Sequence, residues 1–131
     1  MGTWENWSGT VSVAPTRVYV PRTTAEVADL VARAAERGRR LRPVGSGHSF
    51  TPIAAPVEGQ VSLRHLTGIV SADREAGAVR VAAGTSLHEL NDALARIGLG
   101  MVNLGDIDRQ TISGALATGT HGTGSELTGL A

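Results

Sequence analysis

Apolar residues recur every three or four positions in two segments of the chain, the spacing of a helix with one buried face. The first set is Val27, Leu30, Val31 and Ala34. The second set is Leu87, Leu90, Leu94 and Ile97. We expect the first helix to begin after Thr23 or Thr24 and to stop at Gly38. Ser86 and Glu89 form a capping box at the start of the second helix, and Gly98 ends it.

Short runs of β-branched and apolar residues predict strands around these helices. They are residues 17–20, 40–44, 61–63, 69–70 and 78–82. The first two runs flank the first helix, so residues 17–44 are expected to form a β-α-β unit. The last two enclose a turn at residues 73–77, which predicts a hairpin. Residues 1–15 are polar and predict an irregular lead-in, and residues 51–60 predict a loop.

Length and charge narrow the classes of protein to which the chain can belong. Its 131 residues suffice for one ordinary domain. Twelve basic residues balance twelve acidic ones, which argues against binding nucleic acid by bulk electrostatics. The chain has no cysteine, so a disulfide scaffold, a thiolate zinc site and a cysteine nucleophile are excluded. Neither a signal peptide nor an apolar run long enough to cross a membrane is visible in the sequence.

Glycine is over-represented, with 17 residues in 131, and it gathers in a few loops. The first of these, Gly45–Ser49, directly follows a predicted strand. Glycines there allow the backbone to bend and to approach a ligand, and the exposed N–H groups of such a bend can bind an anion. A dinucleotide fingerprint would need a third glycine where Phe50 stands. A tight turn without a ligand is the alternative.

A second glycine-rich segment runs from Gly114 to Gly124. Gly114 and Gly119 have the spacing of a phosphate-binding P-loop, but Thr120 stands in place of the required lysine, which excludes that motif. What remains is a short helical stretch of small residues followed by a loop of glycines and hydroxyl residues. Small residues would let a flat ligand lie against the backbone. The alternative is a glycine-rich connection.

The four histidines are His48, His65, His88 and His121. None of them has the spacing of a zinc protease site, and the chain contains no serine-hydrolase elbow. His65 and His88 are expected on the surface. His48 and His121 lie inside the glycine-rich segments, where an imidazole can act as a nucleophile, a proton carrier or a hydrogen-bond donor.

Three motifs together resemble the N-terminal FAD-binding domain of the vanillyl-alcohol oxidase family, and most of all its sugar-lactone and alditol oxidases. They are residues 44–50, 103–106 and 117–122, and the resemblance extends from Asn6 onward. It implies an α+β fold, the PCMH-type FAD-binding domain, truncated on its C-terminal side. In that fold FAD lies between two small α/β subdomains, here about residues 17–70 and from about residue 78.

The resemblance also assigns roles to residues of both glycine-rich segments. The first loop would wrap the FAD pyrophosphate, and His48 would be covalently attached to the flavin, since a neutral imidazole nitrogen is a competent nucleophile. The residues around the second segment would line the flavin ring and the phosphates. Among them Asp106, which precedes the segment, departs from the small neutral residue of some members, and a ribityl hydroxyl is its expected partner. The expected cofactor-binding residues are Pro43, Val44, Gly45, Ser46, Gly47, His48, Ser49, Asp106, Thr111, Gly114, Ala117, Thr118, Gly119, Thr120 and His121.

The implied reaction is oxidation of a CH–OH group of a sugar lactone, of the D-arabinono-1,4-lactone or L-gulono-1,4-lactone type. Hydride passes to the flavin, which oxygen or another acceptor reoxidises. The alternatives are an alditol oxidase, another covalent-flavin alcohol or amine oxidase, and a non-catalytic nucleotide-binding module. The substrate-capping domain and the catalytic residues are expected beyond Ala131, so these residues alone are expected to be inactive. No metal site is predicted, and the expected location is the cytoplasm, with peripheral membrane association of the longer parent allowed.

Overall fold

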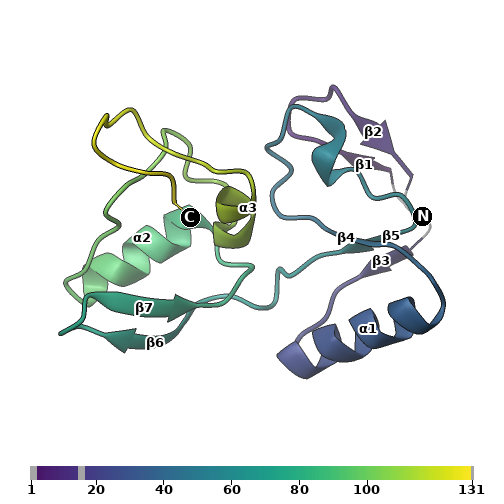
Figure 1. The fold of residues 1–131 in the computed structure, drawn as a ribbon, viewed down its shortest axis with the longest axis horizontal. Coiled ribbons are helices and arrows are strands. Elements are labelled where there is room, and N and C mark those ends of the chain that lie inside the picture. Colours follow the sequence, from purple (N-terminus) through teal and green to yellow (C-terminus); the bar gives the residue numbers. More distant parts are fainter. Residues whose placement is uncertain (1–2, 15–16, 131) are drawn as a thin grey trace. The chain divides into compact units, whose positions relative to one another are not determined.

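The structure, a computed structural model, describes residues 3–14 and 17–130. By their internal contacts the residues form two compact units, Met1–Leu66 (unit 1) and Thr67–Ala131 (unit 2). Figure 1 labels the elements of both units. Each unit is described below by itself, because each contains its own strands and helices and one of the two glycine-rich segments.

Unit 1 contains a parallel sheet of three short strands, β3 (Arg17–Tyr19), β4 (Leu41–Pro43) and β5 (Gly59–Val61). The last of these strands in the sequence, β5, lies in the middle of the sheet, so β3 and β4 both pair with it and not with each other. The predicted strands before and after the first helix are thus confirmed.

The third strand begins two residues earlier than predicted. The sequence places a strand at residues 61–63, whereas β5 spans Gly59–Val61. A Cβ at Gly59 would lie 2.9 Å from Leu41 Cδ2 and 3.1 Å from Tyr19 Cε2, the side chains of the two flanking strands. Glycine is therefore the residue that fits at this central position. In a sequence, glycine is typical of a loop, so a strand glycine that its neighbours require is not recognised as part of a strand.

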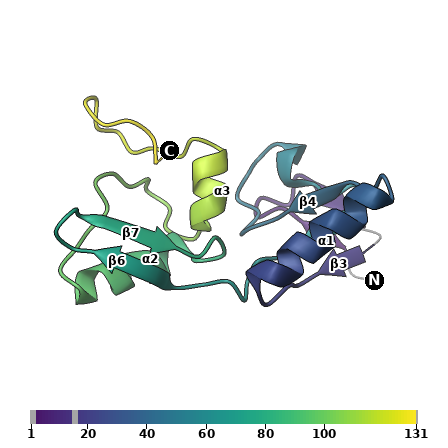
Figure 2. The same cartoon turned by 60° about the horizontal axis from the view of Figure 1, so that its bottom comes forward.

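The first helix, α1 (Thr24–Glu36), has the predicted ends. The Thr23 hydroxyl accepts a hydrogen bond from the Glu26 backbone N–H at 3.1 Å, and Gly38 adopts a φ of +59° just after the C-cap. Leu30 and Ala34 on its apolar face are buried. Figure 2 shows α1 running alongside β3 and β4, and its apolar face is directed at the sheet.

The N-terminal segment contains structure that the sequence did not predict. Strands β1 (Trp4–Glu5) and β2 (Ser12–Val13) form a small antiparallel hairpin in place of an irregular lead-in. Two residues per strand are too few to produce a recognisable alternation of apolar and polar positions. The loop of residues 51–60 likewise contains a single 3₁₀ turn, η1 (Pro52–Ala54).

Unit 2 begins with the predicted hairpin, formed by β6 (Ile69–Asp73) and β7 (Ala78–Val81) in antiparallel pairing. At its turn the Asp73 carboxylate accepts hydrogen bonds from the backbone N–H groups of Glu75 and Ala76, and Gly77 has a φ of +62°. An aspartate followed by a glycine with positive φ is typical turn chemistry. Because β6 pairs with β7, it belongs to unit 2.

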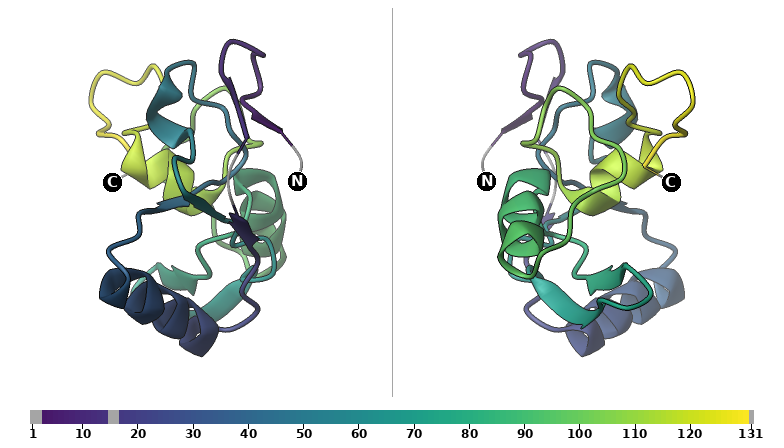
Figure 3. Two further views of the ribbon diagram at one scale, coloured as in Figure 1. Left: turned by 90° about the vertical axis from the view of Figure 1, so that its right-hand side faces the viewer. Right: turned by 90° about the vertical axis from the view of Figure 1, so that its left-hand side faces the viewer.

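Two helices complete unit 2, α2 (Leu87–Arg96) and α3 (Ile112–Ala117). The capping box of α2 is confirmed: the Ser86 hydroxyl accepts from the Glu89 backbone N–H, and the Glu89 carboxylate accepts from the Ser86 backbone N–H. Leu87, Leu90 and Leu94 are buried on one face of α2, as predicted. Figure 3 shows the last loop of the chain, in yellow, returning toward the end of α3.

We predict that Ser86→Ala lowers the free energy of unfolding by about 1 kcal/mol, the usual cost of losing a helix N-cap. The hydroxyl that satisfies the Glu89 N–H is lost, and the Glu89 carboxylate loses a second partner at 2.9 Å. Chemical denaturation of wild type and variant measures the difference. Ser71→Ala, at an exposed position of β6, is the matched control. An equal change in both variants would contradict the proposed importance of the cap.

Candidate functional site

The first glycine-rich loop leaves the sheet of unit 1 at the end of β4. Val44 is buried, and its backbone N–H donates to the Val61 carbonyl at 2.9 Å, so the loop starts from a fixed point on β5. Gly47 has a φ of +69°, a conformation that favours glycine. A Cβ there would also lie 3.4 Å from Trp4 Cζ2. That distance is ordinary van der Waals contact, so the bend depends on this glycine through its backbone angle.

The N-terminal hairpin holds this loop through the side chain of Asn6, which is only 3% exposed. Its Nδ2 donates to the Ser49 carbonyl at 2.9 Å and to the hydroxyl oxygens of Ser8 and Thr10. Its Oδ1 accepts from the Val11 backbone N–H at 3.0 Å. A buried amide with both ends hydrogen-bonded fixes the two segments that it joins. Sequence reasoning missed this residue, although Asn6 opens the region over which the resemblance extends.

Backbone donors on the loop are available to a ligand. Within the described residues, the N–H groups of Gly45, Gly47 and His48 donate to no protein acceptor. Consecutive N–H groups at a glycine bend form a concave donor set that suits a phosphate or pyrophosphate. The His48 ring likewise forms no hydrogen bond with the part of the protein that the structure describes, so both ring nitrogens remain available. The loop therefore fits the pyrophosphate role expected for residues 43–49.

The second glycine-rich segment is anchored at both ends within unit 2. Thr111 caps α3 by accepting from the Gly114 N–H, and the Ile112 N–H donates to the Thr85 carbonyl at 2.8 Å. After the helix, the Thr120 N–H donates to the Ala115 carbonyl at 3.0 Å, and Gly119 between them has a φ of +63°. The predicted short helix running into a loop is confirmed.

Small residues in this segment permit close packing of its backbone. A Cβ at Gly122 would collide with the Leu104 carbonyl oxygen, and one at Gly105 would lie 3.1 Å from Thr120 Cγ2. Gly119 differs, because no atom of the described residues lies within 4 Å of a Cβ placed there. Its requirement for glycine comes from its backbone angle alone. Close packing thus requires glycine at positions 105 and 122, and the backbone angle requires it at position 119. The sequence does not show this difference.

The expected site residues of unit 2 differ in exposure. Ala117, Thr118, Gly119, His121 and Asp106 are exposed, and within the described residues the Asp106 side chain forms no hydrogen bond or ion pair. Thr120 is half-buried and donates its hydroxyl hydrogen to Gln110 Oε1 at 3.1 Å. Residues 43–49 belong to unit 1 and residues 106–121 to unit 2, so the structure assembles each set on its own unit.

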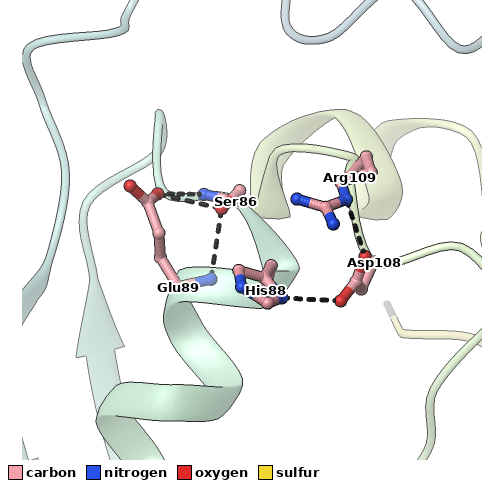
Figure 4. A network of polar contacts seen from close by, with 5 residues as sticks. All are labelled: Ser86, His88, Glu89, Asp108 and Arg109. Carbon is pink, nitrogen blue, oxygen red and sulfur yellow. Dashed lines mark hydrogen bonds and ion pairs between the residues drawn. The ribbon is translucent and has the colours of Figure 1, made fainter.

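The remaining histidines lie on the surface, as expected, and His88 has a structural role. Its Nδ1 lies 2.8 Å from Asp108 Oδ2, and Arg109 Nε lies 3.3 Å from Asp108 Oδ1. Figure 4 shows this network beside the capping box of α2. An ionised carboxylate only accepts, so the Nδ1 nitrogen carries the proton that is shared with Asp108. The network ties the segment that precedes α3 to the first turn of α2.

Two carboxyl groups of this network have lowered pKa values. The backbone N–H of Ser86, followed by its hydroxyl, holds the pKa of Glu89 below the ordinary value. The hydrogen bond from His88, with the nearby charge of Arg109, does the same for the pKa of Asp108. Both groups are solvent-exposed, so their interactions are screened by water.

Residues 3–14 and 17–130 contain neither a metal site nor a membrane-spanning helix. No group of three or more histidine, cysteine or acidic residues in them could hold a metal ion. No helix in the same ranges is long and apolar enough to cross a membrane.

Comparison with known proteins assigns the fold and the glycine-rich segments to a family. Residues 15–131 match the family described as the FAD binding domain. The chain belongs to this family. Its predicted α+β fold of the PCMH-type FAD-binding domain is confirmed by similarity to cholesterol oxidase from B. sterolicum, with a TM-score of 0.79 and 29% identity over 92% of this chain. FAD is accordingly the cofactor of the domain.

Two curated relatives of the FAD-binding domain are named as lactone dehydrogenases. The L-gulono-1,4-lactone dehydrogenase of Mycobacterium tuberculosis is 46% identical over 92% of the chain. The mitochondrial L-galactono-1,4-lactone dehydrogenase of Brassica oleracea is 39% identical over 95% of the chain. The chain spans 28% and 21% of the lengths of these two relatives, and 24% of the cholesterol oxidase.

The lowered pKa of Glu89 predicts a loss of stability in acid. A carboxyl group whose pKa is lower in the folded state stabilises the fold above its unfolded pKa, about 4.3 for glutamate, and this contribution disappears as the pH falls through the folded pKa. In Glu89→Gln the free energy of unfolding should therefore fall less between about pH 6 and pH 3 than in wild type. Denaturation at several pH values measures this, with Glu75→Gln in the hairpin turn as control. Parallel curves for wild type and Glu89→Gln would refute the prediction.

Proposed function

We propose that the FAD-binding domain is part of a flavin-dependent oxidoreductase that oxidises a CH–OH group of a sugar lactone. The observation that carries this proposal is the 46% identity to an L-gulono-1,4-lactone dehydrogenase over 92% of the chain. A second relative, at 39% identity, is also named as a lactone dehydrogenase, which favours a lactone over an alditol as substrate. Bound FAD would supply the acceptor for a hydride from the carbinol carbon, and oxygen or another acceptor would reoxidise it.

Unit 1 would hold the charged part of the cofactor. The N–H groups of Gly45, Gly47 and His48, which donate to no acceptor among the described residues, suit the pyrophosphate, and the positive φ of Gly47 is typical of a phosphate-binding bend. Ser46 and Ser49 would contact the same group through a backbone N–H or a hydroxyl. Pro43 and Val44, which have no backbone N–H to offer, would border it through van der Waals contact. The firm attachment of this loop to Asn6 supports the proposal, because a preorganised donor set loses little conformational freedom when a ligand binds.

Unit 2 would contact the flavin with the segment around α3. The proposed contacts are Asp106, Thr111, Gly114, Ala117, Thr118, Gly119, Thr120 and His121. Exposed small residues such as Ala117 and Gly119 would let the ring lie close to the backbone. The exposed carboxylate of Asp106 suits a hydroxyl of the ribityl chain, since a carboxylate would repel a phosphate.

The catalytic residues of the reaction are proposed to lie outside residues 1–131. A cytoplasmic location stays a prediction.

The substrate class is tested by anaerobic reduction of the flavin in the protein expressed from its complete gene. We expect L-gulono-1,4-lactone or D-arabinono-1,4-lactone to bleach the flavin absorbance rapidly and xylitol to bleach it slowly or not at all. The reason is that both named relatives act on lactones. Faster reduction by xylitol than by either lactone would reject the lactone proposal in favour of an alditol oxidase.

We further propose that His48 carries the flavin covalently. Its imidazole lies in the loop that suits the cofactor, and its ring nitrogens have no protein partner within the described residues. After acid precipitation, the flavin fluorescence should remain in the wild-type pellet and move to the supernatant in His48→Ala. His65→Ala, at an exposed histidine outside the loop, should behave as wild type. Release of all flavin from wild type would exclude covalent attachment while leaving FAD binding itself untouched.

A further inference from the structure

Trp7, between β1 and β2, is a large aromatic side chain whose position is not explained by burial. It is 63% exposed. Its ring stacks on the imidazole of His48, with centroids 5.3 Å apart and planes inclined by 29°. The edge of Phe50 also approaches it, at a centroid distance of 6.2 Å. Offset stacking at this distance is a favourable aromatic arrangement, so Trp7 packs against a proposed cofactor ligand.

The backbones that carry the two rings are tied to each other. The Trp7 N–H donates to the Gly47 carbonyl at 2.9 Å, which is one residue before His48. The buried amide of Asn6 donates to the Ser49 carbonyl, which is one residue after His48. Both neighbours of His48 are therefore bound to residues 6 and 7. The two segments that carry the stacked pair are thus joined by two hydrogen bonds, which keep the rings close to each other.

We infer that Trp7 is a positioning residue that holds the His48 imidazole in one orientation toward the flavin. His48 has no hydrogen bond from its ring to other described residues, so stacking is the interaction that restricts ring rotation. An indole face can do this without occupying a ring nitrogen, which a hydrogen-bonding partner would do. Both nitrogens thus stay available while the ring is oriented. This inference rests on the proposed role of His48, and the experiments below separate the two.

The contact itself is tested without cofactor, by tryptophan emission in the apo form of the complete protein. A ring stacked on an indole changes the emission of that indole, so the part of the emission that is lost in Trp7→Phe should change in intensity or wavelength in His48→Asn. The same part should stay as in wild type in His65→Asn. Emission from Trp7 that is equal in wild type and His48→Asn would show that the two rings are not stacked in solution, and would overturn the inference.

The positioning role is tested by adding FAD to the apo forms of four proteins: wild type, Trp7→Leu, Trp7→Phe and Phe50→Leu. In Trp7→Leu, covalent attachment should be about three- to tenfold slower, the range expected for loss of one aromatic pair. Trp7→Phe should stay within about twofold of wild type, because a smaller ring can still stack. Phe50→Leu is the matched control, since Phe50 is an exposed aromatic of the same cluster that contacts Trp7 edge-on. Equal slowing in Trp7→Leu and Phe50→Leu would overturn the inference.

A double-mutant cycle separates this inference from the proposed attachment. On the His48→Ala background, Trp7→Leu should leave the affinity for FAD unchanged, because Trp7 acts through His48. Should wild type bind FAD without a covalent bond, the attachment proposal fails and the inference is decided by affinity alone. Trp7→Leu must then weaken FAD binding about threefold or more with His48 present and not at all in its absence. The same effect on both backgrounds, or none on either, would overturn it.

Discussion

The buried amide of Asn6 is the interaction on which the first glycine-rich loop depends. A segment of glycines and serines has little side-chain surface to pack, so it cannot determine its own conformation by burial. Asn6 replaces that missing packing with directional hydrogen bonds to Ser49, Ser8 and Thr10 and from Val11. Removing such a buried amide would leave the Ser49 carbonyl and the Val11 N–H without these partners, which is more costly than never having made the bonds.

In unit 2 the glycine-rich segment is held in place by hydrogen bonds at the N-terminus of α2. The first N–H groups of α2 need acceptors, and the carbonyls of Gln110 and Asp108 accept from Leu87 and His88, each at 2.8 Å. A β-bridge between Ser86 and Thr111 continues this contact to the cap of α3. The network of His88, Asp108 and Arg109 adds charge at the same place (Figure 4). The hydrogen bonds that satisfy the first N–H groups of α2 therefore also position the glycine-rich segment that begins at α3.

In each unit the glycine-rich segment is thus held in place by hydrogen bonds to other segments of the same unit. Preorganisation of this kind suits a large cofactor, because the backbone loses little freedom on binding. The three motifs that resemble the family lie in or near these loops, within the residues 15–131 that match it. The core residues of the helices, such as Leu87 and Leu90, would serve many folds, whereas the position of Gly47 or Gly119 with positive φ serves one backbone path.

Local sequence determined the two long helices, their caps and the β6–β7 hairpin, because hydroxyl caps, terminal glycines and alternating residues act within a few positions. The sequence also located both glycine-rich segments, and their motifs indicated the family to which the chain belongs. Tertiary structure alone decided the roles of Gly59, Asn6 and Trp7. Gly59 is a strand residue because Leu41 and Tyr19 leave no room for a Cβ. Asn6 and Trp7 act on residues about forty positions away in the chain, and contacts between such distant residues leave no periodic pattern near either partner.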